Sequence, residues 1–231
     1  MKNLVIGNAG QIGSAIQRIL ECDGYDNVNA NEMPSEHYDA LHITIPYSEN
    51  FIEIVKKYLN IYEPDICIIH STVPIGTTEQ IPNAVYSPCR GVHPELEKGI
   101  RTFVKYFAGD KSDVAAGIFK EKGMTCTIAR YPKATRSLEA AKLWDTTQYG
   151  WNIVLEKAIH TYCVENNLDF KLVYTLFNES YNYGYEKLGF PQYKKYILEH
   201  RIGKIGGHCV IPNLELLKSP ITQIIKDLNI D

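Results

Sequence analysis

Leu4-Val5-Ile6-Gly7-Asn8-Ala9-Gly10-Gln11-Ile12-Gly13 opens the chain and decides its fold. The apolar triplet predicts a short buried strand, and isoleucines at 12, 16 and 19 recur at the spacing of a helix. Strand, glycine turn and helix in this order predict a phosphate-binding turn, because the helix N-terminus offers unpaired N–H groups to an anion. Its expected residues are Gly7, Asn8, Ala9, Gly10, Gln11, Ile12 and Gly13.

The three glycines of this turn have different expected tasks. Gly7 permits the tight turn, Gly10 lets the backbone approach a pyrophosphate, and Gly13 permits close packing of helix against strand. Their spacing is GxxGxxG, one residue longer than the common GxGxxG. The turn therefore predicts a dinucleotide cofactor.

An acidic residue beyond the glycines indicates which dinucleotide is bound. We expect the second strand at 27–30, ending at Asn31 and Glu32. A carboxylate at that place takes the ribose hydroxyls of NAD and repels the 2′-phosphate of NADP. Glu32, with Asn31 beside it, therefore favours NAD; a solvated glutamate at a strand end is the alternative.

Strands and helices continue to alternate, which predicts an α/β protein with a Rossmann-type doubly wound parallel sheet. We expect strands at 40–45 and 65–70 with a helix at 48–59 between them. Ligands of such sheets bind at the carboxyl ends of the strands. The residues expected to line the cofactor there are Ile45, Pro46, Tyr47, Ser71 and Thr72.

The alternation stops after Pro132, which divides the chain into a cofactor-binding domain at 1–132 and an all-helical domain at 133–231. One long helix is expected at about 135–166. Further helices are expected at 171–179 and to about 199, with a loop at 203–213 and a last helix to 228.

Composition argues against several function classes. The chain has 231 residues and a net charge of −3, so the concentrated basic face of a nucleic-acid-binding protein is not expected. No apolar run approaches the ~20 residues that span a bilayer. The first residues run straight into a strand, and the six cysteines form no CxxC pair. We expect a reduced, cytoplasmic protein without a signal peptide, metal site or disulfide framework.

Four further motifs appear in a fixed order along the chain. They are Ser71-Thr72-Val73-Pro74-Ile75-Gly76-Thr77-Thr78, Ser87-Pro88-Cys89-Arg90, Leu138-Glu139-Ala140-Ala141-Lys142-Leu143 and Gly206-Gly207-His208-Cys209. With these motifs the chain resembles the UDP-glucose/GDP-mannose dehydrogenase family over nearly its whole length. The resemblance implies an NAD-dependent oxidoreductase, and the chain stops where that family's third, nucleotide-sugar-binding domain would begin.

The resemblance carries catalytic roles over to three residues. Thr72 matches a hydroxyl near the cofactor, Lys142 an oxyanion-stabilising lysine, and Cys209 the thiol that captures an aldehyde. Three polar partners differ: the family has glutamate, asparagine and aspartate where this chain has Cys89, Thr146 and Asn213. These replacements put a four-electron oxidation to an acid in doubt.

Gly91-Val92-His93-Pro94 is similar to the Gly-x-His-Pro stretch of prephenate dehydrogenases. A histidine suits the removal of a proton from a substrate hydroxyl, so His93 is a candidate base. The alternative is that His93 only ends a strand.

The helical half offers candidate substrate-binding residues. Lys142 and Thr146 lie four residues apart on the long helix and share a face. Arg201, Lys204 and His208 suit a phosphate or carboxylate, with a solvated basic face as an equal alternative. By analogy with related dehydrogenases, this half is also expected to form a homodimer.

These observations predict an NAD-dependent dehydrogenase that acts on a hydroxyl group of an anionic metabolite such as a sugar nucleotide or sugar derivative. His93 and Lys142 are its candidate substrate-contacting bases, and Asn213 a candidate substrate ligand. Two alternatives stay open: a two-electron dehydrogenase of the prephenate or hydroxy-acid type that uses His93, and an NAD-binding sensor or subunit without catalysis.

Overall fold

The computed structural model describes residues 1–28, 32–92, 94–207 and 209–229. The chain divides into two compact units, Met1–Lys142 and the residues from Leu143 onward. This division falls inside a helix, beyond the boundary after Pro132 that the sequence suggests.

A five-stranded parallel sheet forms the centre of the first unit. The strands lie in the order β2 (Asp23–Tyr25), β1 (Asn3–Ile6), β3 (Ala40–Ile43), β4 (Ile66–Ile69) and β5 (Ala84–Tyr86). The chain passes from β1 to β2 on one side and then returns to β3 on the other, so the strand order reverses between β1 and β3. Ligands of open α/β sheets bind at such a switch point.

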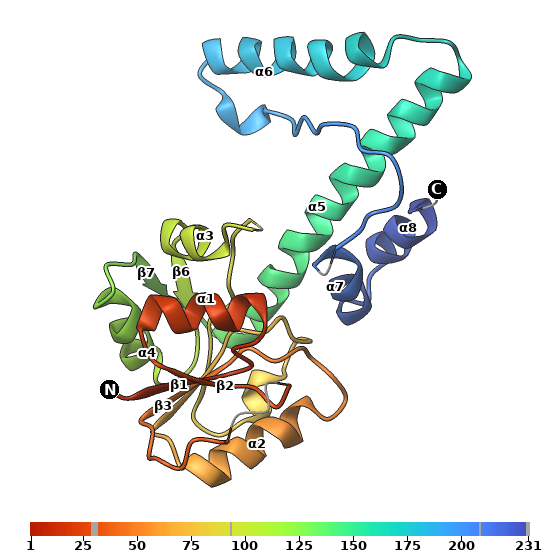
Figure 1. The fold of residues 1–231 in the computed structure, drawn as a ribbon. Coiled ribbons are helices and arrows are strands. Elements are labelled where there is room, and N and C mark those ends of the chain that lie inside the picture. Colours follow the sequence, from red (N-terminus) through yellow and green to blue (C-terminus); the bar gives the residue numbers. More distant parts are fainter. Residues whose placement is uncertain (29–31, 93, 208, 230–231) are drawn as a thin grey trace. The chain divides into compact units, whose positions relative to one another are not determined.

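Helices cover both faces of this sheet (Figure 1). One layer holds α1 (Gln11–Leu20), α3 (Leu96–Thr102) and α4 (Ser112–Lys120), while α2 (Phe51–Tyr62) lies on the other face. Successive strand residues point to opposite faces. Ile66 and Ile68 pack with the first layer, and Cys67 and Ile69 pack with α2. The doubly wound Rossmann-type fold predicted from the sequence is confirmed.

Two smaller features complete the first unit. Strands β6 (Lys105–Phe107) and β7 (Cys126–Ile128) form a separate parallel pair, which an antiparallel bridge between Tyr86 and Ala108 joins to β5. A short 3-10 helix lies at Thr78–Gln80.

A series of hydrogen-bonded polar side chains crosses the interior of this unit. The Nε2 atom of His42 lies 3.1 Å from Asn3 Oδ1, and its Nδ1 lies 3.0 Å from His70 Nε2. His70 Nδ1 donates to the carbonyl of Ser87 at 2.7 Å, and Lys105 Nζ donates to the same carbonyl at 3.2 Å. Both imidazoles and the ammonium group are buried.

The second unit is all helical, as predicted. The long helix α5 (Ala134–Glu165) begins in the first unit and continues into this one. A π-helical turn at Lys171–Leu176 leads into α6 (Phe177–Lys187), and a 3-10 turn follows at Pro191–Tyr193. The helices α7 (Val210–Leu216) and α8 (Pro220–Leu228) close the chain, and Val154, Val210, Leu214 and Ile225 form their small shared core.

Two predictions for this unit are wrong. Helix α6 ends at Lys187, so residues 194–199 are not helical. Residues 203–213 are not all loop, because Val210–Leu216 is the helix α7, which buries Val210 and Leu214.

Candidate functional site

The glycine turn between β1 and α1 has the geometry that its sequence predicted. Gly7 has a φ of +95°, and a Cβ there would lie 2.9 Å from both Ile45 N and Thr44 Oγ1. A Cβ at Gly13 would overlap the carbonyl of Gly7. Gly10 is different, because a Cβ there would meet only that carbonyl, at 3.4 Å. Gly7 and Gly13 are therefore required by packing, while Gly10 keeps the outer side of the turn open.

The N-terminus of α1 offers donors to a ligand. Gly10 is the N-cap and has no side chain to satisfy the N–H groups of the first turn. Ala9, Gly10 and Gln11 are exposed, Asn8 and Ile12 are half-buried, and no acidic residue lies in the first turn. An anion is the favoured ligand at this place.

The second strand lies earlier than predicted, which changes the candidate ribose ligand. Its residues are Asp23–Tyr25, paired with Leu4–Ile6. Of the strand predicted at 27–30, Asn27 and Val28 form a turn instead, and residues 29 and 30 lie outside the described part of the chain. The first carboxylate after β2 is therefore Asp26, whose Oδ2 accepts from the N–H of Ala9 at 3.3 Å. Glu32 is exposed and outside a strand, and Asn31 lies outside the described residues.

The ends of β3 and β4 are tied together at the same edge of the sheet. Ser71 Oγ donates to the carbonyl of Ile45 at 2.6 Å. Thr72 is half-buried, Pro46 is exposed, and Tyr47 lies with its ring 5.5 Å from that of Phe51. The predicted cofactor-lining residues Ile45, Pro46, Tyr47, Ser71 and Thr72 thus occupy two neighbouring loops at the carboxyl ends of adjacent parallel strands.

Sequence reasoning assigned no role to Glu139, which anchors the loop after β4. Its Oε2 accepts from the N–H of Gly76 at 2.5 Å and its Oε1 from that of Thr78 at 2.8 Å. The side chain is fully buried, and burial raises the pKa of this carboxyl group. Two of the sequence motifs, 71–78 and 138–143, are therefore physically joined.

The motif after β5 points partly into the core. The thiol of Cys89 is buried and accepts from Lys105 Nζ at 3.6 Å. Arg90 donates to the carbonyl of Val104 at 2.9 Å, with its guanidinium over the ring of Phe103. The candidate base His93 lies outside the described residues.

Three candidate residues of the second unit, Thr146, Cys209 and Asn213, lie in or beside α7. Thr146 on α5 accepts from Asn213 Nδ2 on α7 at 3.3 Å. Two of the positions at which this chain departs from the family pattern are thus in contact with each other. Cys209 is exposed and directly precedes α7, whereas His208 lies outside the described residues. Lys142, half-buried on α5, is the last residue of the first unit.

The segment that leads to Cys209 is fixed from α5 and from the chain's end. Lys157 Nζ donates to the carbonyls of Arg201 at 2.6 Å and Gly203 at 2.5 Å. The N–H of Ile205 donates to Asn229 Oδ1 at 2.6 Å. These bonds hold residues 201–205 in place, and the backbone then turns at Gly207, which has a φ of +79°.

Acidic side chains contact part of the basic neighbourhood before this segment. His200 Nδ1 lies 2.8 Å from the buried Glu156 Oε1, and its ring stacks on His160 at 3.6 Å. Arg201 is exposed and 3.7 Å from Glu199. Lys204 is exposed. Arg201 and Lys204 thus both lie on the surface of this segment.

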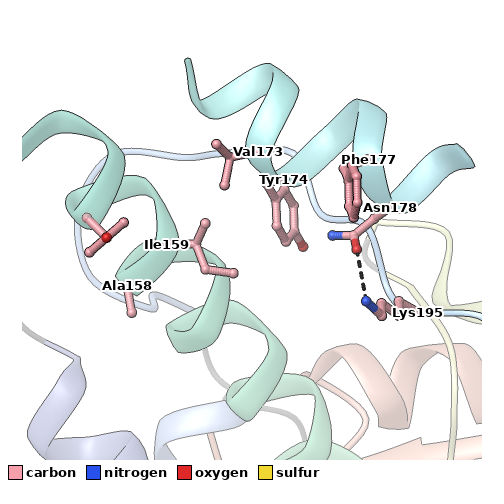
Figure 2. Close-up of a pocket in the computed structure, with 8 residues that line it drawn as sticks. Ala158, Ile159, Val173, Tyr174, Phe177, Asn178 and Lys195 are labelled. Atoms are coloured by element: carbon pink, nitrogen blue, oxygen red, sulfur yellow. Dashed lines mark hydrogen bonds between the residues drawn. The ribbon is translucent and has the colours of Figure 1, made fainter. Parts of the chain in front are cut away.

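An apolar groove of about 470 Å³ lies between α5 and α6 and was not foreseen from the sequence (Figure 2). Ile159, Tyr174 and Phe177 line it, and Lys195 Nζ donates across one side to Asn178 Oδ1 at 3.4 Å. None of the predicted site residues borders it.

The described residues hold no cluster of three or more metal-binding side chains. None of their helices combines the length and apolar character that crossing a bilayer requires.

The fold and the glycine turn define a Rossmann-type protein with a helical second half. No protein-family model and no curated protein matches the chain. Solved structures do match. A UDP-D-ManNAc dehydrogenase from Pyrococcus horikoshii aligns with 99% of this chain and 68% of its own, at 15% identity and a TM-score of 0.77.

Two other matches have similar scores. A UDP-glucose dehydrogenase from Pyrobaculum islandicum aligns with 99% of this chain and 68% of its own, at 13% identity and a TM-score of 0.69. Mycobacterium tuberculosis 3-hydroxyisobutyrate dehydrogenase aligns with 100% of this chain and 96% of its own, at 12% identity and a TM-score of 0.64. This chain thus has the fold of these dehydrogenases and spans about two thirds of the nucleotide-sugar enzymes.

Proposed function

We propose that this chain is an NAD-dependent dehydrogenase that oxidises a hydroxyl group of an anionic metabolite, a sugar nucleotide or sugar derivative. The observation that carries the proposal is the set of groups at the switch point of the sheet. There, the glycine turn leaves open N–H donors for a pyrophosphate, and Asp26 supplies a carboxylate at the end of β2.

The residues present fit this cofactor. Replacing Gly7 or Gly13 by a residue with a Cβ would fill the space that the turn needs, whereas Gly10 leaves its outer side free. Asp26 takes the role that the sequence gave to Glu32, and its negative charge favours NAD over NADP. When bound, NAD supplies the acceptor for a hydride.

Side chains of the protein then bind and deprotonate the substrate. Lys142 stabilises the alkoxide that forms as the hydroxyl loses its proton, and His93 or Lys142 receives that proton. Thr72 hydrogen-bonds near the reacting carbon, and Thr146 and Asn213 orient the substrate. Arg201, Lys204 and His208 bind its anionic group. Cys209 adds to an aldehyde only if oxidation continues to the acid.

A specific observation favours a two-electron variant of this proposal. The family's glutamate is Cys89 here, and its thiol is turned toward Lys105 inside the first unit. The Thr146–Asn213 pair likewise carries no carboxylate. A two-electron reaction that ends at the aldehyde or ketone requires neither the family's glutamate nor its carboxylate at the position of Asn213.

The cofactor proposal is tested by isothermal titration of NAD and NADP. Asp26→Asn removes a charged acceptor of ribose hydrogen bonds, which contribute about 1.5–3 kcal/mol, so NAD affinity falls roughly 10- to 100-fold. Glu32→Gln is the matched control and leaves the affinity unchanged. Loss of affinity in the control but not in Asp26→Asn would refute this assignment.

The reaction itself is tested by counting NADH per substrate across nucleotide sugars, sugar phosphates and hydroxy acids. One NADH supports the two-electron reaction, and two NADH with loss of acid formation in Cys209→Ser support the covalent role of that cysteine. Tight NAD binding without any turnover contradicts the enzyme proposal and favours the sensor.

We also propose that two copies of the chain associate through the helical unit. Large apolar side chains are exposed along α5, the π-helical turn and α6: Leu155, Tyr162, Val164, Leu168, Leu172, Leu176 and Phe177. Monomers rarely expose large contiguous apolar patches. Phe177 is one of the residues that line the groove of Figure 2, and its side chain is 67% exposed. In a two-fold pair, the Phe177 ring of each copy can therefore pack against the groove of the other copy. Light scattering tests this, with Phe177→Glu expected to give monomers and Val114→Glu, exposed on α4, as the control.

A further inference from the structure

Lys105 has an unusual position for a lysine. It is the first residue of β6, its side chain is 3% exposed, and its ammonium group lies 4.9 Å from the centre of the Phe119 ring. Burial lowers the pKa of Lys105. Lysines are almost never fully buried unless an opposite charge compensates them.

The compensating group is not a carboxylate. Among the residues that the structure describes, no carboxylate forms an ion pair with Lys105. Its polar neighbours are the carbonyl of Ser87 at 3.2 Å, His70 Nδ1 at 3.3 Å and Cys89 Sγ at 3.6 Å. Of these three, only the Cys89 thiol can become an anion by losing a proton.

Cys89 and Lys105 therefore form an amine–thiol pair inside the protein. Lys105 Nζ donates a hydrogen bond to Cys89 Sγ, so the transfer of one proton between these two atoms interconverts an ammonium–thiolate pair and an amine–thiol pair. The thiolate is the form of cysteine that attacks an oxidant, and a neutral amine is also a nucleophile. The other buried cysteine of this sheet, Cys67, has no hydrogen bond to an amine among the described residues, and burial raises the pKa of its thiol to about 12.

A small pocket of about 10 Å³ reaches the pair. Its walls include Cys89, Arg90 and Lys105. This is about the space of one water-sized molecule. Hydrogen peroxide is the smallest common thiol oxidant, so this narrow opening hinders it less than it hinders the larger disulfide oxidants.

From this geometry we propose that Cys89 and Lys105 are an oxidation site at which hydrogen peroxide produces a covalent S–N cross-link. The thiolate sulfur attacks one oxygen of peroxide, the O–O bond breaks, and water leaves as Cys89 becomes a sulfenic acid. The Lys105 amine then attacks that sulfur; an S–N bond forms, the S–O bond breaks, and a second water leaves. One peroxide is reduced to two waters, and the pair loses two hydrogen atoms.

The cross-link joins two segments of the first unit. Cys89 follows β5, and Lys105 begins β6, so the new bond closes the stretch between them, which contains α3 and the candidate base His93. The amine would no longer be available to the carbonyl of Ser87 or to His70. This site is independent of the proposed dehydrogenase activity.

Peroxide treatment of the full-length protein followed by peptide mass spectrometry tests the proposal. In the wild type we expect a peptide pair joined through Cys89 and Lys105, lighter than the separate peptides by two hydrogen atoms and released by dithiothreitol. Lys105→Arg keeps the charge but removes the nucleophilic amine, so Cys89 should stop at a sulfenic acid that dimedone traps. Cys89→Ser should give no cross-link, and Lys120→Arg, a surface change, should behave as the wild type.

Two results overturn the proposal. One is a Cys89 that stays reduced when the exposed Cys209 is fully oxidised. The other is a dimedone-trapped Cys89 in the wild type beside an unmodified Lys105. Both are read from the wild type alone, so the test stands even if Lys105→Arg does not fold. Cofactor binding and turnover do not enter either readout, so failure of the proposed function leaves this test intact.

Discussion

Acidification from pH 7 to pH 5 should destabilise the sheet unit through its buried histidines. Burial lowers the pKa of His42 to about 3, and burial together with Lys105 lowers the pKa of His70 well below its usual range. In the unfolded chain both return to about 6.5. Because the unfolded state binds more protons, this stability is present above about pH 6.5 and is lost as the pH falls toward the folded-state pKa.

The magnitude follows from the same values. A histidine that stays neutral in the folded state and has a pKa of about 6.5 when unfolded loses about 2 kcal/mol of stabilisation between pH 7 and pH 5. The pair therefore loses up to about 4 kcal/mol, a large share of the 5–15 kcal/mol that stabilises a typical domain. Neither the polar neighbour Asn3 nor Lys105 supplies a negative charge to offset this.

Hydrogen exchange measured by mass spectrometry separates this effect from changes elsewhere. Opening free energies of peptides from β3 and β4 should fall by up to about 4 kcal/mol between pH 7 and pH 5, after correction for intrinsic exchange. In His42→Gln/His70→Gln, which cannot gain a proton, the dependence should be nearly flat. A flat wild-type profile, or an equally steep profile in the double variant, would contradict the reasoning. If the variant does not fold, histidine NMR of the wild type decides, since neither ring should titrate between pH 5 and pH 7.

Three further predictions concern single residues. Gly13→Ala places a Cβ against the backbone of Gly7, so it should lower the free energy of urea unfolding by about 3 kcal/mol and abolish NAD binding. Gly10→Ala should lower the unfolding free energy by less than about 1 kcal/mol, and equal effects of the two substitutions would be inconsistent with the packing described. Glu139→Ala leaves two backbone N–H groups without their acceptor and should lower the unfolding free energy by about 2–4 kcal/mol; a change under about 0.5 kcal/mol would mean that water replaces the carboxylate. Lys157→Met releases two carbonyls of the segment before Cys209 and should raise the rate at which that thiol reacts with a disulfide reagent, and an unchanged rate would show that the segment is held by other bonds.

The glycine turn could be predicted from the sequence because its constraints are local. A positive φ at Gly7 and the overlap of any Cβ at Gly13 with the backbone depend on residues within a few positions. The same holds for α5, predicted at about 135–166 and found at Ala134–Glu165, since helical periodicity persists over many turns.

The position of β2 could not be predicted in this way. Asp23–Tyr25 contains no apolar run, and it becomes a strand only because it pairs with β1 after α1 ends in the left-handed residue Glu21. That pairing moves the candidate ribose ligand from Glu32 to Asp26. Glu139 was missed for a related reason: its partners, the N–H groups of Gly76 and Thr78, are distant in sequence and carry no side-chain signal.

The division of the chain inside α5 limits how the protein can be taken apart. Helix α5 has 32 residues, about 48 Å at 1.5 Å per residue, and the boundary after Lys142 falls within its continuous hydrogen-bonded turns. A protease that needs an extended loop finds no linker at that boundary, and a gene fragment cut there leaves each product with a broken helix end. The two units are thus compact without being modular: neither can be excised, exchanged or expressed alone without removing part of the element that completes it.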